Sequence, residues 1–125
     1  MLKARPKLLI IDDEKDICEH QERIFSKRNF ATYSARNKSQ AISQALKVLP
    51  DIAIIDIHLG KESGIEILKK LRQICPRCKC IIVSWDKQRA RQAKKMGALD
   101  FLIKPATIED LLQAVKKATG GLAKK

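Results

Sequence analysis

The chain has 125 residues, and 45% of them are apolar, which is enough to build one hydrophobic core. Its apolar runs are too short for a membrane span and do not follow the pattern of a secretory signal, so we expect a cytoplasmic protein. The 26 Lys and Arg residues against 14 Asp and Glu residues give a net charge of +12, which attracts anionic partners whatever the fold.

Five short apolar runs alternate with longer segments of helical period, a pattern that predicts repeated βα units and a parallel sheet. The predicted strands are residues 7–11, 30–34, 52–55, 80–84 and 101–103. The first, third and fourth runs show no polar alternation, as expected for strands that helices cover on both faces. We expect one α/β domain over residues 1–120, followed by a tail or the start of a linker at 121–125.

Apolar residues recur at helical spacing after each predicted strand. The stripes of the first three and the fifth helix contain Ile17, Ile24, Phe25, Ala41, Ile42, Ala45, Leu46, Ile65, Leu68, Leu71, Ile108, Leu111, Leu112 and Val115. The fourth helix, around residues 87–96, is the least marked, because it is apolar only at Ala90, Ala93 and Met96. For the fifth helix, "TIED" at 107–110 resembles a capping box and "GG" at 120–121 marks the end.

Four of the predicted βα units place a polar side chain at the end of an apolar run. Asp12 and Asp13 follow the first strand, Asp56 follows the third, Ser84 closes the fourth and Lys104 follows the fifth. The carboxyl ends of parallel strands share one edge of the sheet, where open α/β sheets bind ligands. We therefore expect these five side chains to lie together.

Three carboxylates at one edge would raise one another's pKa values unless cations compensate them. Mg²⁺ takes carboxylate and carbonyl oxygens, so Asp12, Asp13 and Asp56 predict a magnesium site, with the adjacent pair in a loop because successive strand residues point to opposite faces. Lys104 and the metal would together hold an anion with several oxygens, most simply a phosphoryl group, and Ser84 adds a hydroxyl donor. Asp56 would then act as a nucleophile and form an aspartyl phosphate.

The order and spacing of these motifs resemble the receiver domain of two-component response regulators, including the single-domain chemotaxis regulators. The matching stretches are "LLIIDDEKDI", "DIAIIDIHLGKESGIEILKKLR", "IIVS" and "GALDFLIKP", which cover nearly the whole chain. The resemblance implies a flavodoxin-like (βα)₅ fold, a doubly wound parallel sheet with the strand order 2-1-3-4-5.

The resemblance also implies roles for individual residues. Asp56 would be phosphorylated by transfer from a phosphohistidine on a sensor histidine kinase or phosphotransfer protein. Asp13 would bind Mg²⁺ directly and Asp12 through water, while Asp56 and the backbone carbonyl of His58 would be further ligands. Such a module is no enzyme beyond its own phosphorylation and dephosphorylation.

On the same basis, Lys104 would contact the phosphoryl group, and its peptide bond to Pro105 would be cis. Ser84 and Phe101 would form the switch pair, although an inward-pointing Phe101 could equally be a plain core residue. The regulated surface would comprise the fourth helix, the fifth strand and the fifth helix. It would serve a downstream effector protein or an output domain absent from this sequence, in a monomer or a phosphorylation-dependent dimer.

Two positions depart from the usual pattern of this family, and the net charge of +12 is also high for it. Trp85 stands where relatives have a small residue, and we expect its bulk to slow hydrolysis of the aspartyl phosphate. Gly60 stands where relatives often have Pro, and we expect a looser loop there. We expect the side chain of His58 to point to solvent while its carbonyl contacts the metal.

Alternative functions can be weighed on specific residues. Cys75, Cys78 and Cys80 form a C-x-x-C-x-C motif, but a zinc site needs a fourth ligand and no histidine is near in sequence, so we expect reduced structural thiols. An aspartyl-nucleophile phosphohydrolase would need a second Asp where His58 stands. A dinucleotide-binding oxidoreductase would need a G-x-G-x-x-G turn where "DDEKDI" stands.

The positive charge is concentrated between residues 61 and 95, where eleven bases face three acids. This leaves a third alternative, a receiver-like module that is not phosphorylated and binds an acidic partner or nucleic acid through its basic face. No aromatic residues are interleaved with the bases, so sequence-specific reading of nucleic acid is not indicated. A solvated basic face is the simplest interpretation.

Overall fold

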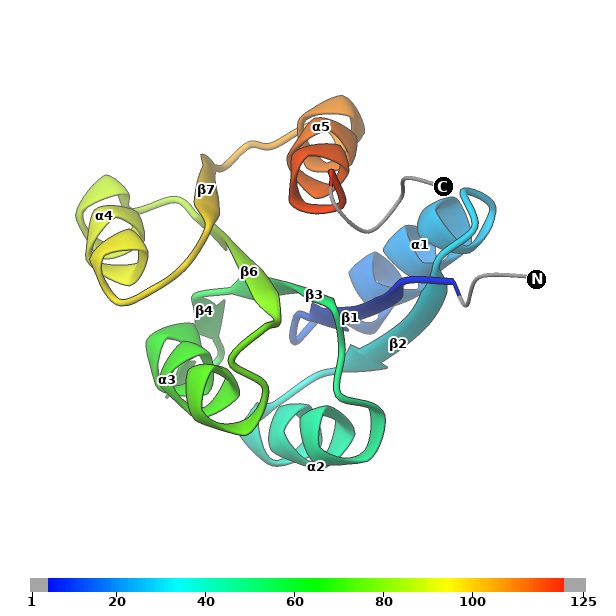
Figure 1. The fold of residues 1–125 in the computed structure, drawn as a ribbon. Coiled ribbons are helices and arrows are strands. Elements are labelled where there is room, and N and C mark those ends of the chain that lie inside the picture. Colours follow the sequence, from blue (N-terminus) through cyan, green and yellow to red (C-terminus); the bar gives the residue numbers. More distant parts are fainter. Residues whose placement is uncertain (1–4, 121–125) are drawn as a thin grey trace.

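The structure is a computed structural model that describes residues 5–120. Its main sheet is parallel, with the order β2-β1-β3-β6-β7, and it runs through the middle of the molecule (Figure 1). The strands are β1 Lys7–Ile11, β2 Ala31–Ala35, β3 Ile52–Asp56, β6 Lys79–Ser84 and β7 Asp100–Ile103. Counted without the hairpin after β3, this order is the predicted 2-1-3-4-5 of a doubly wound, flavodoxin-like sheet.

Helices cover both faces of this sheet. They are α1 Lys15–Ser26, α2 Lys38–Val48, α3 Gly64–Ile74, α4 Lys87–Lys95 and α5 Ile108–Ala118. The α1 and α5 helices lie on one face, and α2, α3 and α4 lie on the other (Figure 1). None of the helices within residues 5–120 is long and apolar enough to cross a membrane.

Successive residues of the central strands enter opposite halves of the core. In β1, Leu8 and Ile10 pack towards α1 and α5, while Leu9 and Ile11 pack towards α2 and α3. The β3 and β6 strands alternate in the same way. Helices cover both faces of these strands, so nearly every position takes a buried apolar residue, which explains why their sequences lack polar alternation.

The α4 helix is held to the sheet by small side chains. Ala90 and Ala93 are its buried residues, and Met96 follows as a partly buried neighbour. Its N-cap is Asp86, whose Oδ1 accepts hydrogen bonds from the backbone N–H groups of Gln88 and Arg89. Small apolar side chains bury little surface, so the hydrophobic attachment of α4 to the sheet is slight.

The expected capping box at the start of α5 is confirmed. Thr107 Oγ1 accepts the backbone N–H of Asp110 at 3.0 Å, and Asp110 Oδ2 accepts the backbone N–H of Thr107 at 3.0 Å. The helix ends at Ala118, just before Gly120. The expected tail or linker at 121–125 lies outside the described residues.

Candidate functional site

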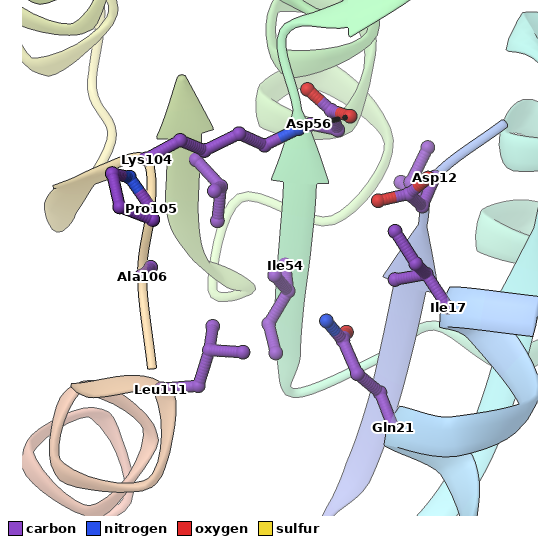
Figure 2. Close-up of a pocket in the computed structure, with 11 residues that line it drawn as sticks. Asp12, Ile17, Gln21, Ile54, Asp56, Lys104, Pro105, Ala106 and Leu111 are labelled. Carbon is purple, nitrogen blue, oxygen red and sulfur yellow. Dashed lines mark hydrogen bonds and ion pairs between the residues drawn. The ribbon is translucent and has the colours of Figure 1, made fainter. Parts of the chain in front are cut away.

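The predicted polar residues gather at the carboxyl edge of the sheet. Asp12 and Asp13 follow the end of β1 in a loop, Asp56 is the last residue of β3, Ser84 is the last residue of β6 and Lys104 follows β7. Figure 2 shows the side chain of Lys104 extending towards Asp56, with Asp12 facing them from the other side. Strand register alone therefore brings together residues that are far apart along the chain.

Asp56 is the centre of this cluster. Its side chain is 5% exposed, and its Oδ2 lies 3.1 Å from Nζ of Lys104, which is 35% exposed. Its Oδ1 accepts the backbone N–H of His58 at 3.0 Å. Each oxygen of this buried carboxylate thus faces a donor.

The three carboxylates form a compact set of oxygen donors. Asp12, Asp13 and Asp56 each offer one oxygen within 4.8 Å of the others, which within residues 5–120 makes them a group able to hold a metal ion. Burial raises the pKa of Asp12 to about 6, and the negative charges of Asp56 and Asp13 add to this rise. Three carboxylates that share one lysine and still raise the pKa of one of their number offer the oxygen donors and the negative charge that a hard divalent cation prefers.

The loop after β1 is fixed by its own hydrogen bonds. Asp12 Oδ1 accepts the backbone N–H of Glu14 at 2.9 Å, and the backbone N–H of Asp12 donates to the carbonyl oxygen of Ala35 at 3.1 Å. The Cys18 thiol donates to the carbonyl oxygen of Asp12 at 3.3 Å. These contacts hold Asp12 at the edge of the sheet before any ligand binds.

A cavity of about 480 Å³ opens beneath the carboxylates, between α1 and α5. Asp12, Asp56 and Lys104 form its polar upper part, and Ile54 and Leu111 lie on its apolar wall (Figure 2). Asp56 borders this space although it is almost fully buried. A small anion can therefore reach the carboxylate.

Gly64, which begins α3, belongs to the site but was not among its sequence-predicted residues. A Cβ atom at this position would lie 2.7 Å from the Cα of Ile57 and would also collide with the carbonyl oxygen of Asp56. The backbone N–H of Gly64 donates to the carbonyl oxygen of Ile57 at 2.7 Å. Only glycine lets the start of α3 approach the end of β3 this closely, so Gly64 helps to position Asp56.

The expectation that the His58 side chain points to solvent is wrong. The residue is half-buried, its ring stacks on Trp85, and its Nε2 lies 3.2 Å from Oγ of Ser84. The indole ring of Trp85 gives the imidazole an apolar surface to stack on, and the hydroxyl of Ser84 gives it a polar partner. No periodic pattern in the sequence indicates these two contacts of the His58 ring.

The expected loosening at Gly60 is also not what the structure shows. His58–Leu59 and Glu62–Ser63 form a small antiparallel hairpin, β4 and β5, closed by Gly60 and Lys61. Gly60 has a φ of +59°, a left-handed value that proline cannot adopt. Glycine at the first position of a two-residue connection matches a type II′ turn, so Gly60 shapes an ordered hairpin.

The other sequence motifs have clear places. The bond between Lys104 and Pro105 is cis, as expected. Phe101 is half-buried, lies beside Ile82 of β6 and packs against the core on the side of α2 and α3, a position open to both of its expected roles. Cys75, Cys78 and Cys80 are free and buried around the turn from α3 into β6, as expected for structural thiols.

Comparison with known proteins agrees with this geometry. The family profile described as the response regulator receiver domain matches residues 8–116. Sporulation initiation phosphotransferase F of Bacillus subtilis is 33% identical over 113 residues, which cover 89% of this chain and 91% of that protein. Acid tolerance regulatory protein ActR of Sinorhizobium medicae is 32% identical over 90% of this chain, which spans only 59% of the length of that regulator.

A solved structure of a response regulator from Burkholderia pseudomallei is also similar. It superposes with a TM-score of 0.83 at 29% identity, covering 94% of this chain and 71% of that one. That protein was crystallised with a phosphorylated aspartic acid, a calcium ion and citrate. The profile match, the sequence relatives and the shared fold together show that this chain belongs to the response regulator receiver domain family.

Proposed function

We propose that this chain accepts a phosphoryl group on Asp56 from a phosphohistidine of a sensor histidine kinase or phosphotransfer protein. The observation that carries this proposal is the buried Asp56 carboxylate, which lies 3.1 Å from the Lys104 ammonium and within 4.8 Å of two further carboxylates. Receiver domains are signalling modules, and a related structure carries a phosphorylated aspartic acid.

The transfer exchanges one bond for another. An oxygen of Asp56 attacks phosphorus, an O–P bond forms, the P–N bond of the phosphohistidine breaks and imidazole leaves. Lys104 supplies a positive charge next to the new group, and the hydroxyl of Ser84 supplies a hydrogen-bond donor once it turns towards it. The phosphoryl group carries about two negative charges in place of the single charge of the carboxylate, so this edge of the sheet gains about one.

Mg²⁺ is the proposed cofactor, because the donor set consists only of oxygens. Asp13 would bind it directly and Asp12 through water, with Asp56 and the backbone carbonyl of His58 as further ligands. When bound, the metal supplies positive charge that neutralises phosphoryl oxygens. The chain's own contribution is to hold the carboxylates in place through the contacts to Glu14 and His58.

The proposed switch runs from Ser84 to α4 through Asp86. Ser84 Oγ accepts the backbone N–H of Asp86 at 2.9 Å, while the Asp86 carboxylate caps α4. A move of Ser84 towards the phosphoryl group would break its hydrogen bond with the backbone N–H of Asp86. Asp86, which caps α4, would then be free to shift. Phe101 is the proposed partner in this change, and α4, β7 and α5 form the proposed output surface.

The proposed partners beyond the kinase follow from the length of this chain compared with its relatives. We place residues 1–120 in the receiver domain and residues 121–125 in a tail or linker, acting in the cytoplasm on an effector protein or an attached output domain. Longer relatives such as ActR leave room for such a domain. We propose that the chain is a monomer, or that it forms a dimer on phosphorylation.

A second candidate function uses the basic face of α4. Its five cations, Lys87, Arg89, Arg91, Lys94 and Lys95, are all exposed, and none forms an ion pair within residues 5–120. This surface favours an acidic partner or the backbone of a nucleic acid. Binding to unrelated duplex DNA that weakens steeply with added salt would support the nucleic-acid version, and the absence of such binding would leave the acidic partner.

The decisive experiment uses acetyl phosphate and Mg²⁺. The wild-type chain should gain the mass of one phosphoryl group, and chelation of the metal should abolish the gain. Asp56→Asn should gain nothing, whereas Asp51→Asn, which changes an acid at the opposite end of β3, should behave as wild type. An equal mass gain in Asp56→Asn would overturn the proposal.

A further inference from the structure

His58, Ser84 and Trp85 form a cluster next to the phosphoacceptor, and the proposed transfer gives no role to the side chains of His58 and Trp85. The ring of His58 stacks on the ring of Trp85, with centroids 4.6 Å apart and 16° between the planes. At its edge, the same imidazole places Nε2 3.2 Å from Oγ of Ser84. The histidine is therefore held on its face by an aromatic ring and at its edge by a hydrogen bond.

The Ser84 hydroxyl has little hydrogen-bonding capacity left for a further partner. It carries one proton and two lone pairs. The backbone N–H of Asp86 donates to Oγ at 2.9 Å, and the carbonyl oxygen of Asp86 lies 3.2 Å away. Nε2 of His58 is the third neighbour, as donor or acceptor according to its tautomer. In this arrangement the hydroxyl is occupied by groups other than Asp56.

We propose that the stacked pair of His58 and Trp85 is a latch that holds the Ser84 hydroxyl in its resting position. This inference rests on the proposed function, because the latch opposes movement of Ser84 towards a phosphoryl group on Asp56. To make that movement, Oγ must give up its contact with Nε2. His58 is thus a positioning residue that acts through Ser84.

Trp85 keeps the latch closed. His58 belongs to β4, a strand of two residues in a surface hairpin, and its side chain is only half-buried. Without a neighbour on its face, the imidazole would be free to take other rotamers. Trp85 is itself 65% exposed, and its stacking on His58 gives this large apolar side chain a partner at an otherwise solvent-facing position.

The backbone contact of His58 can be separated by mutation from the contacts of its ring. Its backbone N–H donates to Oδ1 of Asp56, whereas its ring contacts Ser84 and Trp85. A side-chain substitution therefore removes the latch and leaves the backbone contact to the phosphoacceptor. His58→Phe is the sharpest choice, because phenylalanine retains a planar ring that can stack but has no group for Ser84.

The test measures the affinity of the full chain for beryllofluoride in Mg²⁺ by calorimetry. His58→Phe should bind about fivefold more tightly than wild type, because the loss of one neutral hydrogen bond removes one contact that opposes the switch. His20→Phe makes the same change on the exposed face of α1 and should leave the affinity unchanged. An unchanged affinity in His58→Phe overturns the latch.

A second comparison shows whether His58 acts through Ser84. In a Ser84→Ala background the hydroxyl is gone, so His58→Phe should have no further effect on affinity. An equal gain with and without the hydroxyl would mean that the ring acts directly on the bound anion, and the latch would be wrong. Urea unfolding of each variant verifies that it is folded.

Trp85 provides an independent readout, because it is the single tryptophan of the chain. Opening of the latch should change its fluorescence when beryllofluoride and Mg²⁺ bind to wild type, and Asp56→Asn should show no change. Should His58→Phe not fold, Trp85→Ala, which leaves the ring unsupported, should still bind beryllofluoride more tightly. If wild type itself shows no Asp56-dependent binding, both the proposed function and the latch fail, whereas normal wild-type binding with no gain in either variant rejects the latch alone.

Discussion

The ammonium of Lys104 and the carboxylate of Asp56 form an ion pair of 3.1 Å that joins the ends of β7 and β3. The two partners differ in their surroundings, since Asp56 is 5% exposed and Lys104 is 35% exposed. The lysine reaches in from the surface to a charge that the fold has buried. The cation therefore supports the resting protein as well as the proposed chemistry.

Replacing Lys104 by methionine tests this support. We expect the free energy of unfolding in the presence of a chelator to fall by about 1–2 kcal/mol, less than for a fully buried pair because solvent screens the partly exposed lysine. Lys87→Met, which removes an exposed cation from α4, should change it by less than about 0.5 kcal/mol. Urea unfolding measures both, and equal stability of the two variants would contradict the ion pair's role.

Asp12 should make the stability of the metal-free protein depend on pH. Its folded-state pKa of about 6 lies above the ordinary value of 3.8, so the folded state binds the proton more tightly than the unfolded state. The resulting stabilisation is complete below pH 4 and is lost as the pH rises through 6, by about 2 kcal/mol at pH 7 once solvent screening at this edge of the sheet is allowed for.

Asp12→Asn isolates this effect. The variant should match wild type near pH 4 in chelator and become the more stable protein as the pH rises to 7. Urea unfolding across this range provides the comparison. A constant difference between the two proteins would show that the Asp12 carboxyl is not perturbed.

Gly64→Ala should disturb Asp56, the proposed phosphoacceptor, through the backbone. The new Cβ atom would meet backbone atoms of Ile57 and Asp56 that cannot rotate away. We expect a loss of about 1–3 kcal/mol in the free energy of unfolding, together with weaker Mg²⁺ binding. Gly120→Ala is the matched control, because its Cβ would come no closer than 3.4 Å to another atom. Similar losses in both variants would mean that the close approach at Gly64 is unimportant.

Trp85→Ala should shorten the lifetime of the aspartyl phosphate. The indole stacks on His58, whose backbone N–H donates to Asp56, and we expect this bulk beside the carboxylate to hinder an attacking water. The lifetime is measured by following the phosphorylated mass after the phosphodonor is removed. Trp85→Phe should lie between the two, and equal lifetimes of all three proteins would reject the steric explanation.

The four cysteines should be unreactive in the native protein. Cys18, Cys75, Cys78 and Cys80 are all buried, and burial raises the pKa of Cys18 to about 11 and also raises the pKa of Cys75. A thiol reagent at pH 8 should modify them only slowly, with four thiols appearing in denaturant. Rapid native reaction of two or three thiols, or bound zinc in stoichiometric amount, would revive the metal or redox interpretation of the C-x-x-C-x-C motif.

The fold and the members of the site could be predicted because both depend on local patterns. Central strands such as β3 read as unbroken apolar runs, and Asp56 stands at the end of one. The topology of a parallel sheet then places such residues along one edge without further information. The capping box at Thr107 was equally readable, because both of its hydrogen bonds lie within one helical turn.

What could not be predicted depends on contacts between distant segments. The hairpin that contains His58 has strands of two residues, too short to show a period of two. The contacts of His58 with Ser84 and Trp85 arise only after β3 and β6 pair. The need for glycine at position 64 likewise follows from the packing of α3 on the end of β3.

The attachment of α4 by Ala90 and Ala93 has a consequence for the evolution of this protein. Most positions of this helix contribute nothing to the core, so their side chains are free to change without loss of the fold. Natural variation or a designer can therefore change the surface chemistry of the helix without altering the cluster of side chains around Asp56. Because the surface positions of α4 are separate from the core, a few substitutions there would be enough to fit the same fold to a different binding partner.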